Sequence, residues 1–142
     1  MRSKVTLSFI LALTFIACKK SDEVALVSSD SIQGNWKFLE SSNVTIAGLF
    51  KHPADPSNPI IINFNESSYT ETDAGKVAVT GTYALVNKYE YIPGYFADSV
   101  LTVNNEAKGK YKIHRGQPDT LVLNAIDHGP DYDWNARYLR VK

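Results

Sequence analysis

The chain has 142 residues, of which 44% are hydrophobic, and it carries 15 basic and 15 acidic side chains. This length and composition are typical of one globular domain. The balanced charge gives no sign of a basic surface for nucleic acid, so we expect no nucleic-acid partner. Because Cys18 is the single cysteine, the chain cannot form an internal disulfide.

The first 17 residues have the pattern of a signal peptide. Arg2 and Lys4 form a short positive start, and the uncharged, mostly apolar run Val5–Ile16 follows. At 12 residues this run is shorter than the roughly 20 that a membrane-spanning helix needs. The residues after Cys18 are polar and charged, so the apolar segment stops there. We therefore expect residues 1–17 to be a leader.

The sequence Phe15-Ile16-Ala17-Cys18 resembles the lipobox of bacterial lipoproteins, with Phe15 where leucine is commoner. The resemblance implies cleavage before Cys18, a diacylglycerol on its sulfur and acylation of the new amine. Each buried methylene contributes about 0.8 kcal/mol, so two or three acyl chains anchor a domain stably. Ser21-Asp22-Glu23 resembles the acidic surface-export signal of Bacteroidetes lipoproteins; the alternative is a solvated linker. We expect an outer-membrane lipoprotein of the cell envelope, on its periplasmic or surface-exposed face.

Residues 18–31 are rich in serine and aspartate and predict a lipidated tether, which leaves residues 32–142 as the folded domain. No helical period runs through this domain, and its apolar residues form short runs separated by turn residues. The expected strands are 32–39, 60–64, 68–72, 77–86, 98–103, 109–114, 120–126 and 135–141. Eight strands joined mostly by tight turns predict an all-β, antiparallel up-and-down barrel, whose closure removes exposed edges. An open two-sheet sandwich is the alternative architecture.

Gly34-x-Trp36 on the first strand resembles the Gly-x-Trp motif of lipocalin-like (calycin) barrels. The resemblance covers about residues 32–142 and extends to small lipocalin-like lipoproteins of Bacteroidetes. It implies that Trp36 closes one end of the barrel and that Arg137 or Arg140, from the last strand, lies across its ring. Such a cation–π contact contributes roughly 0.5–2 kcal/mol. The chain departs from secreted lipocalins in lacking their disulfides and an obvious C-terminal helix.

Four aromatic rings surround a Pro-Gly turn in the segment 89–96: Tyr89, Tyr91, Tyr95 and Phe96. A single strand would place these rings on both faces, and the turn would break it. We therefore expect a long hairpin tip or a lid over one barrel end, suited to stacking on a small ligand or a partner. A loop folded back as a small apolar cluster is the alternative.

The other long connection, residues 42–59, carries Leu49 and Phe50 and three prolines after them. Long connections of this kind are usually docked, and in lipocalin-like barrels the first one often folds over the open mouth. We expect Leu49 and Phe50 to contact the barrel there, within a loop that has at most one turn of helix. We also expect this loop and the segment 89–96 to lie near one mouth.

The sequence gives little support for catalysis or metal binding. His52, His114 and His128 do not have metal-ligand spacing. Three aspartates in the segment 127–133 offer oxygen ligands for calcium, but the usual composition of a turn explains them equally well. There is no nucleophile elbow and no phosphate-binding loop. We therefore expect no enzyme activity, no metal and no cofactor.

Together these features favour a lipid-anchored, non-catalytic barrel that binds a small apolar ligand at one end. A module that docks other proteins of an outer-membrane complex is the alternative, and the segment 89–96 would then be its partner surface. A third hypothesis, that the protein inhibits enzymes of the envelope, is supported by fold analogy alone.

Overall fold

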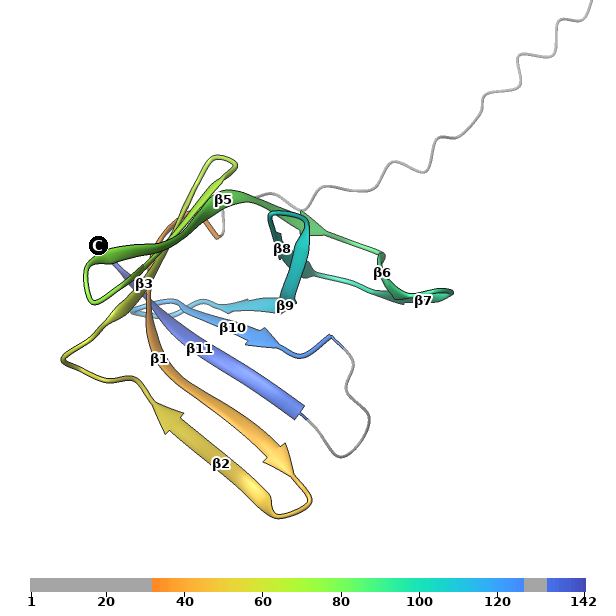
Figure 1. The fold of residues 1–142 in the computed structure, drawn as a ribbon, viewed down its shortest axis with the longest axis horizontal. Coiled ribbons are helices and arrows are strands. Elements are labelled where there is room, and N and C mark those ends of the chain that lie inside the picture. Colours follow the sequence, from red (N-terminus) through yellow and green to blue (C-terminus); the bar gives the residue numbers. More distant parts are fainter. Residues whose placement is uncertain (1–31, 127–132) are drawn as a thin grey trace, which may run out of the picture.

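The structure is a computed structural model that describes residues 32–126 and 133–142 (Figure 1). The regular secondary structure of these residues consists of β-strands alone. The strands are β1 (Gly34–Thr45), β2 (Gly48–Pro53), β3 (Ile60–Asn65), β4 (Ser68–Asp73), β5 (Lys76–Val86), β6 (Tyr89–Ile92), β7 (Tyr95–Ala97), β8 (Val100–Val103), β9 (Glu106–His114), β10 (Thr120–Asn124) and β11 (Asp133–Val141). Within these residues there is no helix with the length and apolar character to cross a membrane.

Eight of the strands form one antiparallel barrel in the order β1, β3, β4, β5, β8, β9, β10 and β11. Pairing of β11 with β1, from Asn35 opposite Val141 to Val44 opposite Asp133, closes the barrel. The closing pair excludes the open sandwich, and the prediction of an eight-stranded, lipocalin-like up-and-down barrel is confirmed. Each of the eight predicted strands overlaps one of these barrel strands.

The core inside the barrel is made of large apolar residues that alternate along the strands. Trp36 and Leu121 are completely buried, and Phe64 is 1% exposed. The Phe64 ring makes edge-to-face contacts with Tyr69 at 5.4 Å and with Tyr83 at 4.8 Å between centroids. Such pairs add to the stability that burial itself provides.

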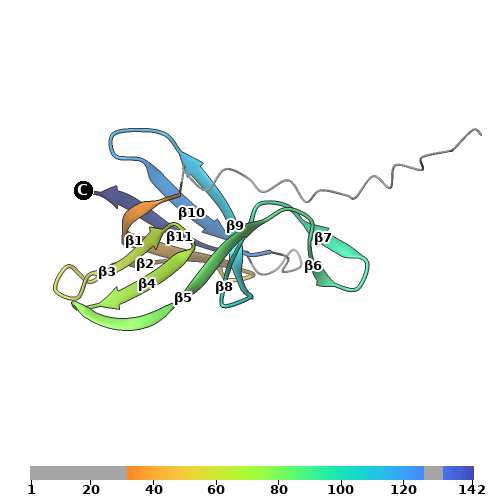
Figure 2. The same cartoon turned by 90° about the horizontal axis from the view of Figure 1, so that it is seen from above.

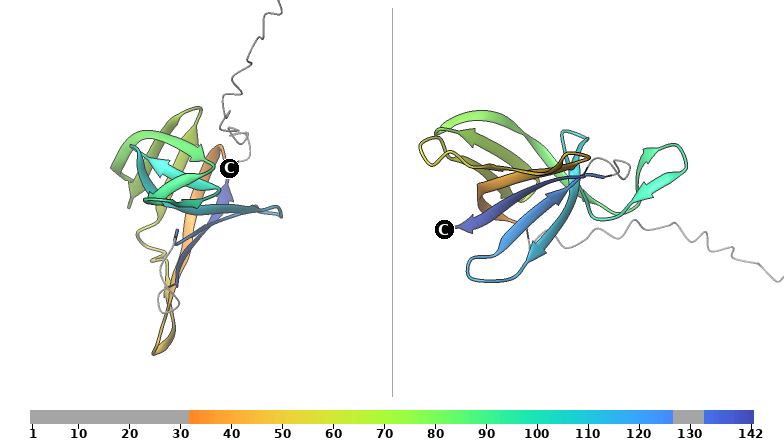
Figure 3. Two further views of the ribbon diagram at one scale, coloured as in Figure 1. Left: turned by 90° about the vertical axis from the view of Figure 1, so that its right-hand side faces the viewer. Right: turned by 90° about the horizontal axis from the view of Figure 1, so that it is seen from below.

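The connection 42–59 is not the docked loop that we expected. Instead β1 continues to Thr45 and pairs with β2, so that a hairpin extends past the barrel wall (Figure 3). The β-branched run Val44-Thr45-Ile46 favours an extended backbone over a helical turn. Every residue of β2 is exposed.

The segment 89–96 forms the expected hairpin, β6–β7, which stands as a separate two-stranded sheet between β5 and β8 (Figure 2). Two hydrogen bonds tie its base together. The Lys88 N–H donates to Asp98 Oδ1 at 3.0 Å, and the Ser99 N–H donates to Asn87 Oδ1 at 3.2 Å. The hairpin therefore leaves the barrel from a fixed base.

The two hairpins leave the barrel from opposite ends of its strands, so the expectation that both lie near one mouth is wrong. Consecutive barrel strands are antiparallel, and connections therefore alternate between the two ends. The β1–β2 hairpin belongs to the first connection and the β6–β7 hairpin to the fourth, three strand crossings later. We name the end of the strands at Gly34 and Val141 the closed end; the connection that carries β6–β7 leaves the barrel from this end and projects away to the side. The end with β1–β2 is the far end.

Candidate functional site

Contacts to Trp36 from Ile32 and Arg140 fill the closed end, and we call this group of contacts the clasp. The indole Nε1–H donates to the Ile32 carbonyl at 2.7 Å, so the residues before β1 fold over the ring. The Arg140 guanidinium carbon lies 4.1 Å from the ring centroid. Arg137 is three residues earlier and faces the outer wall, where it pairs with Glu40 at 2.6 Å. The cation–π contact therefore belongs to Arg140.

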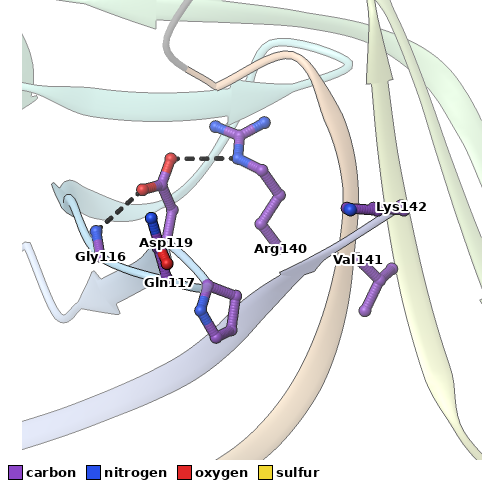
Figure 4. A pocket seen from close by; sticks show the side chains of 7 residues that line it. Gly116, Gln117, Asp119, Arg140, Val141 and Lys142 are labelled. Atoms are coloured by element: carbon purple, nitrogen blue, oxygen red, sulfur yellow. Dashed lines mark hydrogen bonds and ion pairs between the residues drawn. The ribbon is translucent and has the colours of Figure 1, made fainter.

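Asp119 completes this clasp from the loop between β9 and β10. Its carboxylate accepts hydrogen bonds from the Gly116 N–H at 3.0 Å and from Arg140 Nε at 3.2 Å (Figure 4). The Gly116 bond, with help from Arg115 and Arg140, lowers the pKa of Asp119 below its ordinary value of 3.8. Arg140 also donates to the Gln33 carbonyl.

The same residues border a groove of about 570 Å³, lined by residues 116–119 and 140–142. Two of its three charged side chains, Asp119 and Arg140, bond to each other. Because these groups already satisfy one another, we interpret the groove as part of the closed-end structure.

A second group of polar and aromatic side chains lies inside the barrel, and we name it the inner-wall cluster: Phe38, Tyr69, Glu71 and Tyr138. The Tyr69 hydroxyl donates to Glu71 Oε2 at 2.6 Å. The rings of Phe38 and Tyr138 face each other across the β1–β11 pair, edge to face at 5.4 Å. Tyr69 is buried, whereas Phe38, Glu71 and Tyr138 are half-buried.

Burial inside the barrel and the neighbouring Glu71 both raise the pKa of the two phenols. Burial and the Glu71 charge raise the pKa of Tyr138 to about 12. Burial, followed by the hydrogen bond to Glu71, raises the pKa of Tyr69 well above its ordinary value of 10. Tyr69 and Glu71 come from β4 and Tyr138 from β11, strands that are not neighbours in the barrel. The Glu71 charge therefore acts on Tyr138 across the interior.

The inward-facing surface continues from the barrel onto the β1–β2 hairpin at the far end. Trp134 packs against the core and pairs with Asn43, which in turn pairs with Phe50 of β2. His52 Nε2 lies 3.2 Å from Asn43 Oδ1 on the same face. Leu49 pairs with Val44 and lies on the opposite face of the hairpin.

The predicted ligand- or partner-binding residues therefore divide into two groups that do not meet. Leu49 and Phe50 lie on β2 at the far end, and they are 58% and 46% exposed. The other group lies on β6–β7, which leaves the barrel from the closed end: Tyr89, Tyr91, Tyr95 and Phe96. In that hairpin the ring centroids of Tyr91 and Tyr95 lie 6.4 Å apart. Tyr95 and Phe96 are 63% and 59% exposed.

Sequence reasoning did not find the inner-wall cluster, although a signal for it was present. Tyr69 and Glu71 are two residues apart on one strand, so they share a face. A tyrosine that faces the core therefore places Glu71 inside the barrel as well.

Cys18, the leader, the tether and residues 127–132 of the aspartate-rich segment lie outside the described residues. The described residues contain no group of three or more histidine, cysteine or acidic side chains that could hold a metal ion. Comparison of the chain with protein-family models, with curated proteins and with solved structures gives no match.

Proposed function

We propose that this chain is a lipid-anchored protein of the cell envelope whose non-catalytic barrel binds a small apolar ligand. The ligand enters from the far end and contacts the inner-wall cluster. The observation that carries this proposal is the incomplete burial of inward-facing rings. Phe38, Tyr138 and Trp134 all face the interior, yet each remains half-buried. The closed end is filled, because Trp36 is completely buried beneath Arg140.

Ligand binding is tested by thermal unfolding of the purified protein with hydrophobic probes and native lipid extracts. A ligand at 100 times its Kd stabilises the folded state by about 2.7 kcal/mol, which raises Tm by several degrees. Phe38→Ala is expected to reduce the shift, because Phe38 faces the interior. Leu39→Ala changes the next residue, which is 37% exposed, and should leave the shift unchanged. If no probe raises Tm, ligand binding is wrong.

In that event the second candidate function, docking to another envelope protein, is favoured. It draws support from the exposed apolar side chains of the β6–β7 hairpin. Ile92, Tyr95 and Phe96 are 54%, 63% and 59% exposed, and rings of this kind are enriched at protein interfaces.

Anchoring through Cys18 is tested by Cys18→Ser. Serine lacks the thiol to which the diacylglycerol attaches, so we expect incorporation of labelled fatty acid to fall to background. We also expect mass spectrometry to find the leader still in place. Ser21→Ala, three residues further on, is the control and should label normally. Undiminished labelling of Cys18→Ser would contradict the proposal.

A further inference from the structure

Glu71 places a carboxylate on the apolar inner wall. It shares one face of β4 with Tyr69, which is 5% exposed, and it pairs across to Ile62, which is 2% exposed. A glutamate carries a negative charge at neutral pH. Charged side chains are seldom buried unless a partner neutralises them.

Within the described part of the chain, Glu71 forms no ion pair. Its carboxylate accepts one hydrogen bond, from the Tyr69 hydroxyl at 2.6 Å, whereas a carboxylate can accept about four. Arg140, the cation of the closed end, is held there by Asp119 and Trp36. Glu71 as a residue is half-buried.

The charge of Glu71 determines which ligands the barrel can accept. A neutral apolar ligand against this carboxylate would take away its remaining solvation and give nothing in return, which disfavours binding. A cation in the same position would replace the lost solvation with an ion pair. The rings of Phe38, Tyr69 and Tyr138 also attract positive charge through their faces.

We propose that the inner-wall cluster binds an organic cation with an apolar body, and that Glu71 supplies its counter-charge. This inference rests on the proposed ligand-binding function and names its ligand class. The apolar body contacts the half-buried rings of Phe38 and Tyr138. The charged head lies beside Glu71.

The test compares three probes with one body and different heads: 4-phenylbutylamine, 4-phenylbutanol and 4-phenylbutyrate. Their binding to the full-length purified protein is measured by titration calorimetry. We expect the amine to bind with a Kd about tenfold lower than that of the alcohol, and the carboxylate to bind most weakly. Glu71→Gln keeps the side chain's size and its acceptor for Tyr69. We expect it to abolish the preference for the amine while the alcohol still binds.

Glu66→Gln, an exposed carboxylate in the turn between β3 and β4, is the matched control and should keep the preference. Equal binding of the three probes to the original chain would overturn the charge assignment and leave ligand binding intact. A preference that survives in Glu71→Gln would also overturn it. If no probe binds the original chain, the proposed function and this inference both fail. Binding of the alcohol to Glu71→Gln, with an unchanged circular dichroism spectrum, establishes that the variant is folded.

Discussion

Replacement of Trp36 by alanine is expected to lower the free energy of unfolding by about 3–5 kcal/mol. Trp36 is completely buried, and its indole N–H bonds to the Ile32 carbonyl at 2.7 Å. Alanine would leave a cavity at the closed end, an unpaired carbonyl and an Arg140 without its aromatic partner. Because domains have a total stability of about 5–15 kcal/mol, this loss brings the protein close to unfolding.

The measurement is urea unfolding followed by circular dichroism. Trp36→Phe keeps most of the apolar volume but loses the N–H, so we expect a smaller loss of about 1–3 kcal/mol from the unpaired carbonyl and lost contacts. Val77→Ala, at a side chain that is 63% exposed, is the control and should change stability by less than about 0.5 kcal/mol. If Trp36→Ala were as mild as Val77→Ala, Trp36 would not close the barrel.

Most of the barrel strands were predictable because their burial follows a period of two; β8, which is buried at all four positions, is the exception. Tyr83 and Leu85 are buried, and their neighbours Thr82 and Ala84 are exposed. The β2 strand offered no such pattern, since all of its residues are exposed. Its apolar pair Leu49 and Phe50 faces opposite sides of the hairpin, and the prolines after it favoured a loop. Without a buried face, a strand cannot be distinguished from an apolar loop by its sequence pattern.

The site was predictable only where a motif identified it. Gly34-x-Trp36 indicated a closed end, but the choice between Arg137 and Arg140 depends on the register of β11 with β1. That register places Trp36 opposite Arg140, and residues three apart on a strand face opposite sides. The placement of the two long connections was also predictable. In an up-and-down meander the connections alternate between the two ends, so the first connection (residues 42–59) and the fourth (residues 89–96) leave from opposite ends.

Gly109→Ala is expected to destabilise the protein by about 2–4 kcal/mol. Gly109 lies on β9 with a φ of +143°, where a side chain is strained. A Cβ built there would stand 2.5 Å from the Asn124 carbonyl oxygen of β10. Since that oxygen belongs to the backbone, relief requires the two strands to separate and weakens their pairing. Urea unfolding measures the loss.

Gly48→Ala separates the two sources of this cost. Gly48 has a similar φ of +122°, but no atom lies within 4 Å of its would-be Cβ. Its substitution therefore carries the conformational strain alone, about 1–2 kcal/mol. The further loss in Gly109→Ala measures how tightly β9 approaches β10. If the two variants were equally destabilised, that approach would contribute nothing, and φ alone would explain the glycine at position 109.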